Sequence, residues 1–213
     1  MPETSTSPVR LPALIRNEPV QARSTARLAA LLDAAAQVID EIGYERLTTA
    51  MVADRANASI GTVYRYFPDR IAVLQSLSAR NEERITAAVL AEIRDERHGD
   101  WLSALTGACD RYTDAFRSEP GFAALRLGDV LDLRPAEDEP RNSVIANRMY
   151  DALVERFGLV DSNESRFDFE TGYELFDALT ARAFARDPKG DERYLTQARR
   201  ALRAVGAEKI AAL

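Results

Sequence analysis

The chain has 213 residues, 46% of them hydrophobic, and a formal net charge of −6. This length accommodates one large or two small domains with a sizeable core. No apolar run approaches the length of a membrane span, and the first residues lack the apolar core of a signal peptide, so the sequence predicts neither a membrane protein nor export. The single cysteine, Cys109, excludes an internal disulfide and is typical of a reducing cytoplasm.

The charge is spread unevenly along the chain. Residues 1–80 hold nine arginines and eight acidic residues, a net charge of +1, whereas residues 81–213 hold 19 basic and 26 acidic residues, a net charge of −7. An acidic protein is not an obvious partner of nucleic acid. The acidity lies in the second part, however, so a few well-placed arginines in the first part remain compatible with DNA binding.

The first 23 residues are polar, contain four prolines and show no helical period, which predicts a flexible arm. Arg10, Arg16 and Arg23 are spaced along it. Two interpretations stay open: a disordered tail, or an arm that adds phosphate or minor-groove contacts.

A first helix is predicted from about Ser24, because apolar residues recur at helical spacing from Leu28 to Ile42. Gly43 is a natural residue to end it. The stripe of apolar side chains indicates one face packed against a small core.

Two short helices around a tight turn are predicted next. Thr48 or Thr49 can cap the first of them, and Ser59 can cap the second, since a side-chain oxygen there accepts from the first turn. Asn57 between them tolerates the left-handed conformation that a sharp turn needs. Pro68 stops the second short helix.

The remaining sequence is predicted to be helical throughout. Asp69 can cap a long fourth helix that reaches about residue 97, and an acidic, proline-bearing loop is expected at 134–142. Further helical stripes predict five helices, at about 101–118, 120–133, 143–158, 164–186 and 191–211. With no strand pattern and no internal repeat, the fold class is all-α with nine helices.

The segment LTTAMVADRANASIGTVYRYFPDR, from Leu47 to Arg70, resembles the DNA-binding domain of TetR-family transcriptional regulators. The Leu-Thr-Thr entry, the Val-Ala pair, the Ala-x-x-Ser turn and Gly-Thr-Val-Tyr-x-Tyr-Phe carry the resemblance. It is close over 24–75, and the nine-helix count extends it loosely to the whole chain.

The resemblance implies a two-domain, all-helical homodimer. After the arm at 1–23, a helix-turn-helix domain at 24–70 would bind a near-palindromic operator in double-stranded DNA. A helical domain at 71–213 would bind a small-molecule effector and dimerise. Most members of the family repress transcription, and the effector releases them from DNA.

In a helix-turn-helix the second helix enters the major groove by its N-terminal end. Arg65 is the candidate for a bidentate guanine contact, hydroxyls suit phosphate oxygens, and Gly61 permits close approach of the backbone. The resemblance adds Arg70 as a phosphate contact. The residues expected at DNA are Thr48, Thr49, Ser59, Ile60, Gly61, Thr62, Tyr64, Arg65, Tyr66 and Arg70.

Some of these assignments have alternatives. Ile60 stands where the family frequently has a polar or basic residue, so it stays open whether this position reads a base. Contact between Ile60 and a thymine methyl is one interpretation. Tyr64 could belong to the core, stack on a thymine methyl or reach a phosphate, and Arg65 could be a solvated surface residue. Phe67 is expected in the core.

The helical body offers a candidate effector pocket and a candidate dimer interface, each with simple core as the alternative. The pocket candidates are Trp101, Leu105, Cys109, Tyr112, Phe116, Arg126, Asp129, Asn147 and Tyr150. The interface candidates are Phe169, Tyr173, Phe176, Leu179, Leu195, Ala198, Leu202 and Val205.

Catalysis is hard to build from this sequence. The only histidine, His98, is expected in an exposed loop beside Gly99 and has no metal-ligating cluster around it, and Cys109 on an apolar face is expected to be inert. No phosphate-binding Gly-rich loop and no Gly-x-Ser-x-Gly elbow occurs. We therefore predict a cytoplasmic, non-enzymatic regulator that needs no metal or cofactor. The alternative is a helical small-molecule-binding module without an operator.

Overall fold

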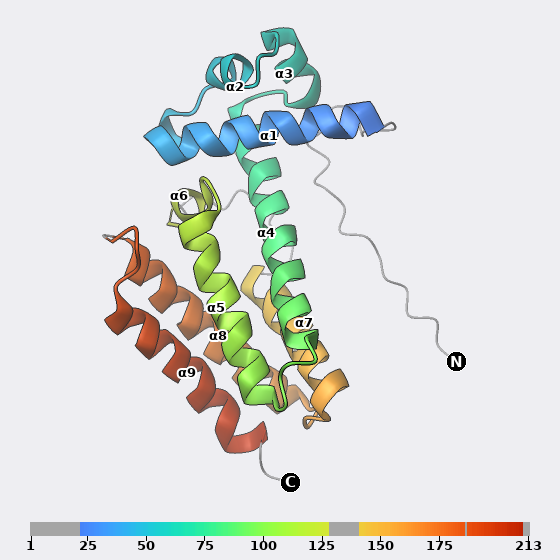
Figure 1. Cartoon of the computed structure of the whole chain (residues 1–213), viewed down its shortest axis with the longest axis vertical. Helices are drawn as coiled ribbons and strands as arrows, with labels where there is room; N and C mark the ends of the chain where they lie inside the picture. The colour runs from blue at the N-terminus through green and yellow to red at the C-terminus, as the bar shows by residue number, and fades with distance from the viewer. Residues whose placement is uncertain (1–21, 128–140, 186, 211–213) are drawn as a thin grey trace. The chain divides into compact units, whose positions relative to one another are not determined.

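The computed structural model of the protein describes residues 22–127, 141–185 and 187–210 (Figure 1). Within these ranges it contains nine α-helices, one short 3-10 helix and no strand, which confirms the predicted all-α class. The predicted arm up to residue 21, and Asp129 of the predicted pocket, lie outside the described residues.

The described residues form two compact units. The first comprises 22–83 together with 120–127, and the second comprises 84–119 and the residues from 141 onward. The predicted boundary after residue 70 stays a prediction, because the fourth helix continues from the first unit into the second along the chain.

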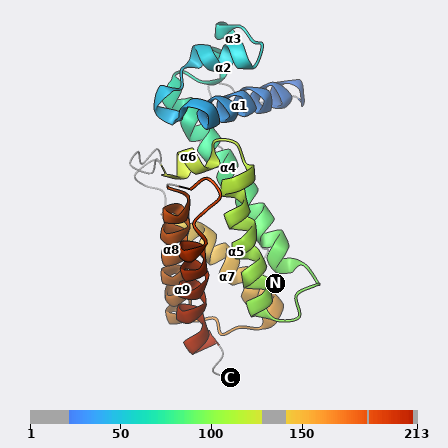
Figure 2. The same ribbon diagram turned by 60° about the vertical axis from the view of Figure 1, so that its left-hand side comes forward.

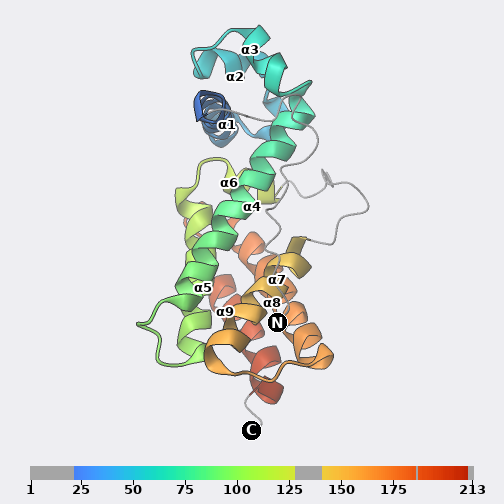
Figure 3. The ribbon, with the colours of Figure 1, turned by 90° about the vertical axis from the view of Figure 1, so that its right-hand side faces the viewer.

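In the first unit, Figure 3 looks along α1 and shows α2 and α3 together on one side of it. The elements are α1 (Ala22–Ile42), the 3-10 helix η1 (Tyr44–Arg46), α2 (Thr49–Arg55), α3 (Ile60–Tyr66), the first part of α4 (Arg70–Arg94) and α6 (Phe122–Leu127). The predicted apolar stripe of α1 is buried, and so are Val52 of α2 and Val63 of α3. Phe67 is fully buried beside them, as predicted.

Local capping sets the short helices. The Thr48 hydroxyl accepts from a backbone N–H of α2 at 3.2 Å, and the Ser59 hydroxyl accepts from one in α3 at 3.1 Å. The Asp69 carboxylate accepts from α4 at 2.9 Å. Asn57 adopts φ +46° in the turn, as predicted for this position. These four residues confirm where the sequence places the helix-turn-helix.

Gly121 lets α6 approach α1 closely. Its backbone N–H donates to the Asp40 carboxylate at 3.2 Å, and its φ is +71°. A Cβ added here would lie 2.9 Å from the Ala36 carbonyl oxygen, which is backbone and cannot move away. Only glycine fits this contact within the first unit.

In the second unit, α8 and α9 run antiparallel and side by side (Figures 1 and 2). Its helices are the second part of α4, α5 (Trp101–Ser118), α7 (Arg141–Phe157), α8 (Asn163–Phe184) and α9 (Glu192–Ile210). The side chain of Val205, a predicted interface residue, lies outside the described part of the chain. The α4 helix ends at Arg94 rather than near residue 97, and the Asp95 side chain accepts from the Arg97 N–H at 3.0 Å to form a turn there. The Arg156 guanidinium of α7 donates to carbonyls at this end, including that of Asp95 at 2.5 Å.

Aromatic residues of α5 and α8 form the centre of the second unit. The Tyr112 ring lies 5.5 Å from that of Phe176, and Phe116 stacks on Phe184 at 4.7 Å between centroids. The Tyr112 hydroxyl donates to the buried carboxylate of Asp177. A buried carboxylate is costly unless hydrogen-bonded, so this contact fixes how α5 and α8 pair.

Replacing Tyr112 with phenylalanine tests this contact. Because the Asp177 carboxylate loses a hydrogen bond to a charged group, we expect Tyr112→Phe to lower the free energy of unfolding by about 1.5–3 kcal/mol. Urea unfolding followed by circular dichroism at one fixed protein concentration measures it. The control is Tyr64→Phe, which removes an exposed hydroxyl and should cost less than about 0.5 kcal/mol. Equal losses in the two variants would count against the buried contact.

Candidate nucleic-acid interface

The α3 helix presents two rows of residues away from its core. Ile60 and Tyr64 are one turn apart with 43% and 45% of their surface exposed, and Gly61 and Arg65 form an exposed row beside them. Its inward side is supplied by Val63, which is fully buried. The rotation of α3 thus leaves the predicted base-reading side chains accessible.

Hydroxyl groups surround the start of α3. The Ser59 hydroxyl lies 2.9 Å from that of Thr62, and the Thr49 hydroxyl of α2 donates to the Tyr64 hydroxyl at 3.3 Å. A Cβ added at Gly61 would meet only the Ser59 Oγ, at 3.9 Å. No clash inside the chain therefore requires glycine here, and its small size leaves room for an approaching partner.

Arg65 is held over an aromatic ring. Its guanidinium carbon lies 5.3 Å from the centroid of Tyr66, a cation–π arrangement that restricts the side chain. Since a restricted guanidinium loses less entropy on binding, Arg65 is suited to a planar two-donor contact.

Tyr66 lies differently from its predicted phosphate contact. The residue is only 2% exposed, and its hydroxyl lies 3.0 Å from that of Ser24 in α1. Tyr66 comes three residues after the buried Val63, so both side chains lie on the same, inward face of α3. We therefore correct this assignment: Tyr66 is a core residue that joins α3 to α1.

Arg70 has a structural contact that its sequence position did not reveal. Its Nη1 donates to the carbonyl oxygens of Glu45 at 2.7 Å and Tyr44 at 3.4 Å. The half-buried guanidinium thereby holds η1 against the start of α4. Guanidinium carries five donors, so these contacts do not use its full capacity.

The candidate pocket residues that the structure describes belong to both units. Tyr112 and Phe116 lie in the α5–α8 aromatic centre, which favours the core alternative for that face, and Arg126 lies on α6 in the first unit. The buried candidates are Leu105, Cys109, Tyr112, Phe116, Arg126 and Tyr150, while Trp101 and Asn147 are half-buried.

The structure favours the core alternative for most residues of the predicted dimer interface. Side chains that fill the space between α8, α9 and their neighbours within one chain are closed to a second copy. Those buried in this way are Phe169, Tyr173, Phe176, Leu195, Ala198 and Leu202, and Leu179 is half-buried. The sequence cannot distinguish an intramolecular stripe from an intermolecular one, because both repeat at helical spacing.

The outer face of α8 carries apolar residues that the sequence reasoning missed. Phe167 is 68% exposed and Leu175 is 45% exposed. Thr171 lies between them and is also exposed, so the three follow each other at four-residue spacing on one face. This second, weaker apolar stripe on α8 is visible in the sequence and could have identified the exposed face.

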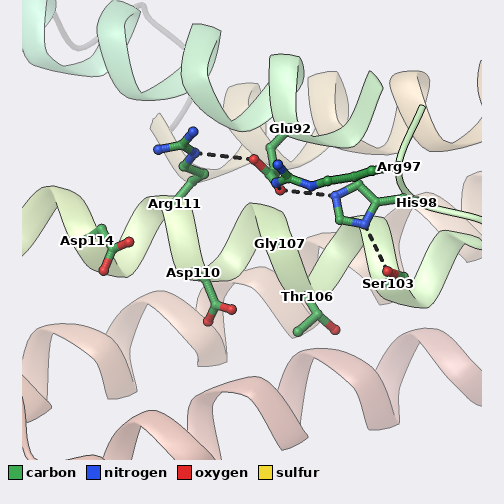
Figure 4. A pocket seen from close by; sticks show the side chains of 9 residues that line it. All are labelled: Glu92, Arg97, His98, Ser103, Thr106, Gly107, Asp110, Arg111 and Asp114. Atoms are coloured by element: carbon green, nitrogen blue, oxygen red, sulfur yellow. Dashed lines mark hydrogen bonds and ion pairs between the residues drawn. The ribbon is translucent and has the colours of Figure 1, made fainter. Parts of the chain in front are cut away.

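His98 lies in the loop between α4 and α5, as predicted, but it is buried rather than exposed, which corrects the expectation from sequence. It is 9% exposed, with Nε2 3.0 Å from Glu92 Oε1 and Nδ1 2.8 Å from the Ser103 hydroxyl (Figure 4). Buried Glu92 also accepts from Arg111 Nε at 3.2 Å and from Arg97. The Glu92 carboxylate thus contacts one imidazole and two guanidinium groups, and these contacts fix the loop between α4 and α5.

This cluster lines one side of an open groove of about 470 Å³ on α5, shown in Figure 4. Gly107 forms part of its floor, and a Cβ added there would lie 2.5 Å from Glu92 Oε1. Among the described residues, no group of three or more His, Cys, Asp or Glu side chains could hold a metal ion. Over the same residues, no helix combines the length and apolar character needed to cross a membrane.

Cys109 is buried, and its thiol is not activated as a nucleophile. Removal from water, followed by the nearby charge of Asp110, raises the pKa of its thiol to about 12. At neutral pH the thiol stays protonated, so the expected inert role is supported by geometry.

Two capped short helices around a left-handed turn, with the exposed Arg65 on the second, define a helix-turn-helix protein of the DNA-binding class. The family model of bacterial regulatory proteins of the tetR family matches residues 31–77. The model of the tetracyclin repressor-like C-terminal domain matches residues 99–206. The chain belongs to the TetR family of bacterial transcriptional regulators.

Similar proteins agree with this assignment. A TetR-family transcriptional regulator from Streptomyces coelicolor is 32% identical, with a TM-score of 0.69 over 85% of this chain and 95% of that one. The HTH-type transcriptional repressor KstR of Mycolicibacterium smegmatis is 42% identical over 57 residues, 27% of this chain and 28% of the repressor. The nucleoid occlusion factor SlmA of Haemophilus influenzae is 26% identical over 109 residues, 51% of this chain and 49% of that protein.

The chain thus spans between about a quarter and a half of the length of the curated relatives it matches. The match to KstR and the tetR family model together identify a DNA-binding transcriptional regulator. A family of this kind is typically non-enzymatic, in line with the expectation from sequence.

The protonated state of Cys109 has a measurable consequence. With a pKa of about 12, on the order of one thiol in 10,000 is ionised at pH 8. We expect a thiol-specific reagent at pH 8 to modify the native protein no faster than it unfolds, and to react promptly once denaturant is added. Modification of the folded protein within seconds would contradict a buried, unactivated thiol.

Proposed function

We propose that the protein is a homodimeric repressor that binds a near-palindromic operator through α3 and is released by a small-molecule effector. The observation that carries the proposal is the exposed double row on α3, with Arg65 oriented over Tyr66, in a member of the TetR family. As a reader of the chromosome it would act in the cytoplasm.

The two rows suit α3 to the major groove. Arg65 offers two donors to guanine, whereas the hydroxyls of Thr48, Thr49 and Ser59 are placed near the ends of α2 and α3 for phosphate oxygens. Arg70 keeps donors beyond Nη1 that suit a phosphate. In a dimer, the two recognition helices would enter successive major grooves about 34 Å apart.

The outer face of α8 is the surface we propose for dimerisation. Phe167 and Leu175 are large apolar side chains that a folded monomer would leave in water, and Leu175 has Ala178 exposed close to it on the same face. A two-fold axis would bring this face against its own copy, with the exposed side of α9 beside it. This assignment replaces the buried interface candidates.

Effector control requires a ligand that favours one arrangement of the protein over the other. The α4 helix takes part in both units along the chain, so we place the ligand-dependent step on its second part, in the unit matched by the C-terminal family model. Repression is supported by the KstR relatives, which are repressors.

The direct test is a mobility-shift assay on genomic fragments selected by the protein. Sequence-specific retention by a dimer is the expected result, and the genes next to the retained fragments indicate the effector class. If every fragment is retained alike or none is retained, the chain is a helical small-molecule-binding module without an operator.

Arg65→Ala tests base reading. If Arg65 contacts guanine, the variant loses about 1–3 kcal/mol of discrimination between operator and random DNA. Titrations on both DNAs at fixed salt measure the difference. The control is Arg193→Ala, which removes an exposed arginine of α9 and should leave discrimination unchanged. An equal loss on operator and random DNA for Arg65→Ala would assign that residue to the phosphate backbone instead.

Leu175→Asp tests the dimer surface. Burial of a leucine contributes about 1.5–3 kcal/mol and counts twice in a two-fold interface, so dimer dissociation should rise by on the order of 100-fold or more. Light scattering at micromolar protein measures the mass. The matched control, Leu102→Asp, changes an exposed leucine of α5 and should stay dimeric. A dimeric Leu175→Asp, or a monomeric native protein, would contradict this surface.

A further inference from the structure

We propose that each operator half-site places thymine methyl groups against Ile60 and Tyr64, beside a guanine that faces Arg65. The inference rests on the proposed operator binding and deepens it by naming the chemistry of the bases that are read. It arises from the composition of the exposed face of α3.

The apolar row of α3, Ile60 and Tyr64, is not part of the core of its own unit. Val63 and Tyr66 supply the buried side of the helix, while Ile60 and Tyr64 project from the other side. Surface isoleucine at the start of a recognition helix therefore stays in water unless a partner covers it. Covering a methyl group removes apolar surface from water and is favourable.

The only apolar group on base edges in the major groove is the thymine methyl. Isoleucine has no donor or acceptor, so pressing Ile60 against the amine of cytosine or the N7 of a purine would leave a polar group without a partner. The Tyr64 hydroxyl already accepts from Thr49, at 3.3 Å, which steadies the ring on the exposed face. Ile60 therefore selects for a methyl rather than for a polar edge, and the steadied ring of Tyr64 offers its apolar face to a second methyl.

The helix geometry limits how far apart the two methyls lie. Four residues along an α-helix rise by about 6 Å, and base pairs stack about 3.4 Å apart, so the contacts fall within about two base-pair steps. Gly61 and Arg65 follow one residue later, rotated by about 100° around the axis. The guanine that Arg65 reads would then neighbour the thymines in the same half-site.

Removing methyls from the operator one at a time tests the inference. Deoxyuridine replaces thymine without its methyl and keeps its hydrogen-bonding edge. In duplexes of the selected operator, we expect substitution at two thymine positions per half-site to raise the Kd of the native protein by about fourfold each. All other thymine positions should show no change.

Protein variants assign each methyl to its side chain. In Ile60→Ala, one of the two sensitive positions should become insensitive to deoxyuridine. In Tyr64→Ala, the other position should become insensitive. Removing a methyl group should not change the Kd when the side chain that contacts it is already absent. Tyr64→Phe should stay sensitive, since the ring is retained. Leu102→Ala is the matched control and should show the full native pattern. Circular dichroism verifies that each variant remains helical.

The outcomes separate this inference from the proposed function. Specific retention of the operator with no deoxyuridine-sensitive thymine overturns the inference and leaves operator binding standing. Sensitive positions that persist unchanged in both alanine variants also overturn it, because some other residue then contacts the methyls. Absence of any specific retention overturns both.

Discussion

Burial of two side chains of α3 and of the residue that follows the helix determines which face of α3 is exposed. Val63, Tyr66 and the adjoining Phe67 enter the core of the first unit and fix the rotation of the helix about its own axis. A helix of seven residues is too short to be stable alone, so tertiary contacts decide both its existence and its orientation. The hydrogen bond between Tyr66 and Ser24 adds a polar attachment to α1. Once the inner face is fixed, the outer rows follow from helical periodicity.

The same logic governs the second unit, with a different outcome. The aromatic contacts of Tyr112 and the hydroxyl that reaches Asp177 turn one face of α8 inward. The opposite face then carries Phe167 and Leu175 outward, and no side chain of the same unit covers them fully. A helix with two apolar faces has more hydrophobic surface than a single subunit buries, which is a common basis for self-association.

The sequence predicts the local features of the first unit well, because their causes are local. Caps at Thr48 and Ser59 and the left-handed turn at Asn57 depend on a few neighbouring residues, and all three are confirmed. Tyr66 and His98 were placed wrongly, since their positions depend on residues distant in sequence or on the tertiary course of a loop. The sequence also left open whether the apolar stripes of α8 and α9 are core or dimer interface, and their burial within one chain favours core. Periodicity reveals that a face is apolar, and only tertiary structure reveals what covers it. The roles at DNA remain predictions that the structure makes geometrically reasonable for Arg65 and Tyr64.

The buried carboxylate of Glu92 restricts how this region can diverge in evolution. Arg97, His98 and Arg111 all converge on it, and the absence of a side chain at Gly107 gives it room. Substituting the carboxylate alone would leave an imidazole and two guanidinium groups without their shared partner, and a methyl at position 107 would displace the carboxylate. We therefore expect substitutions at Glu92, its three partners and Gly107 to occur together rather than singly. Related chains in which residue 107 has gained a side chain should also have lost the acid at 92, so the two columns of a sequence family would covary.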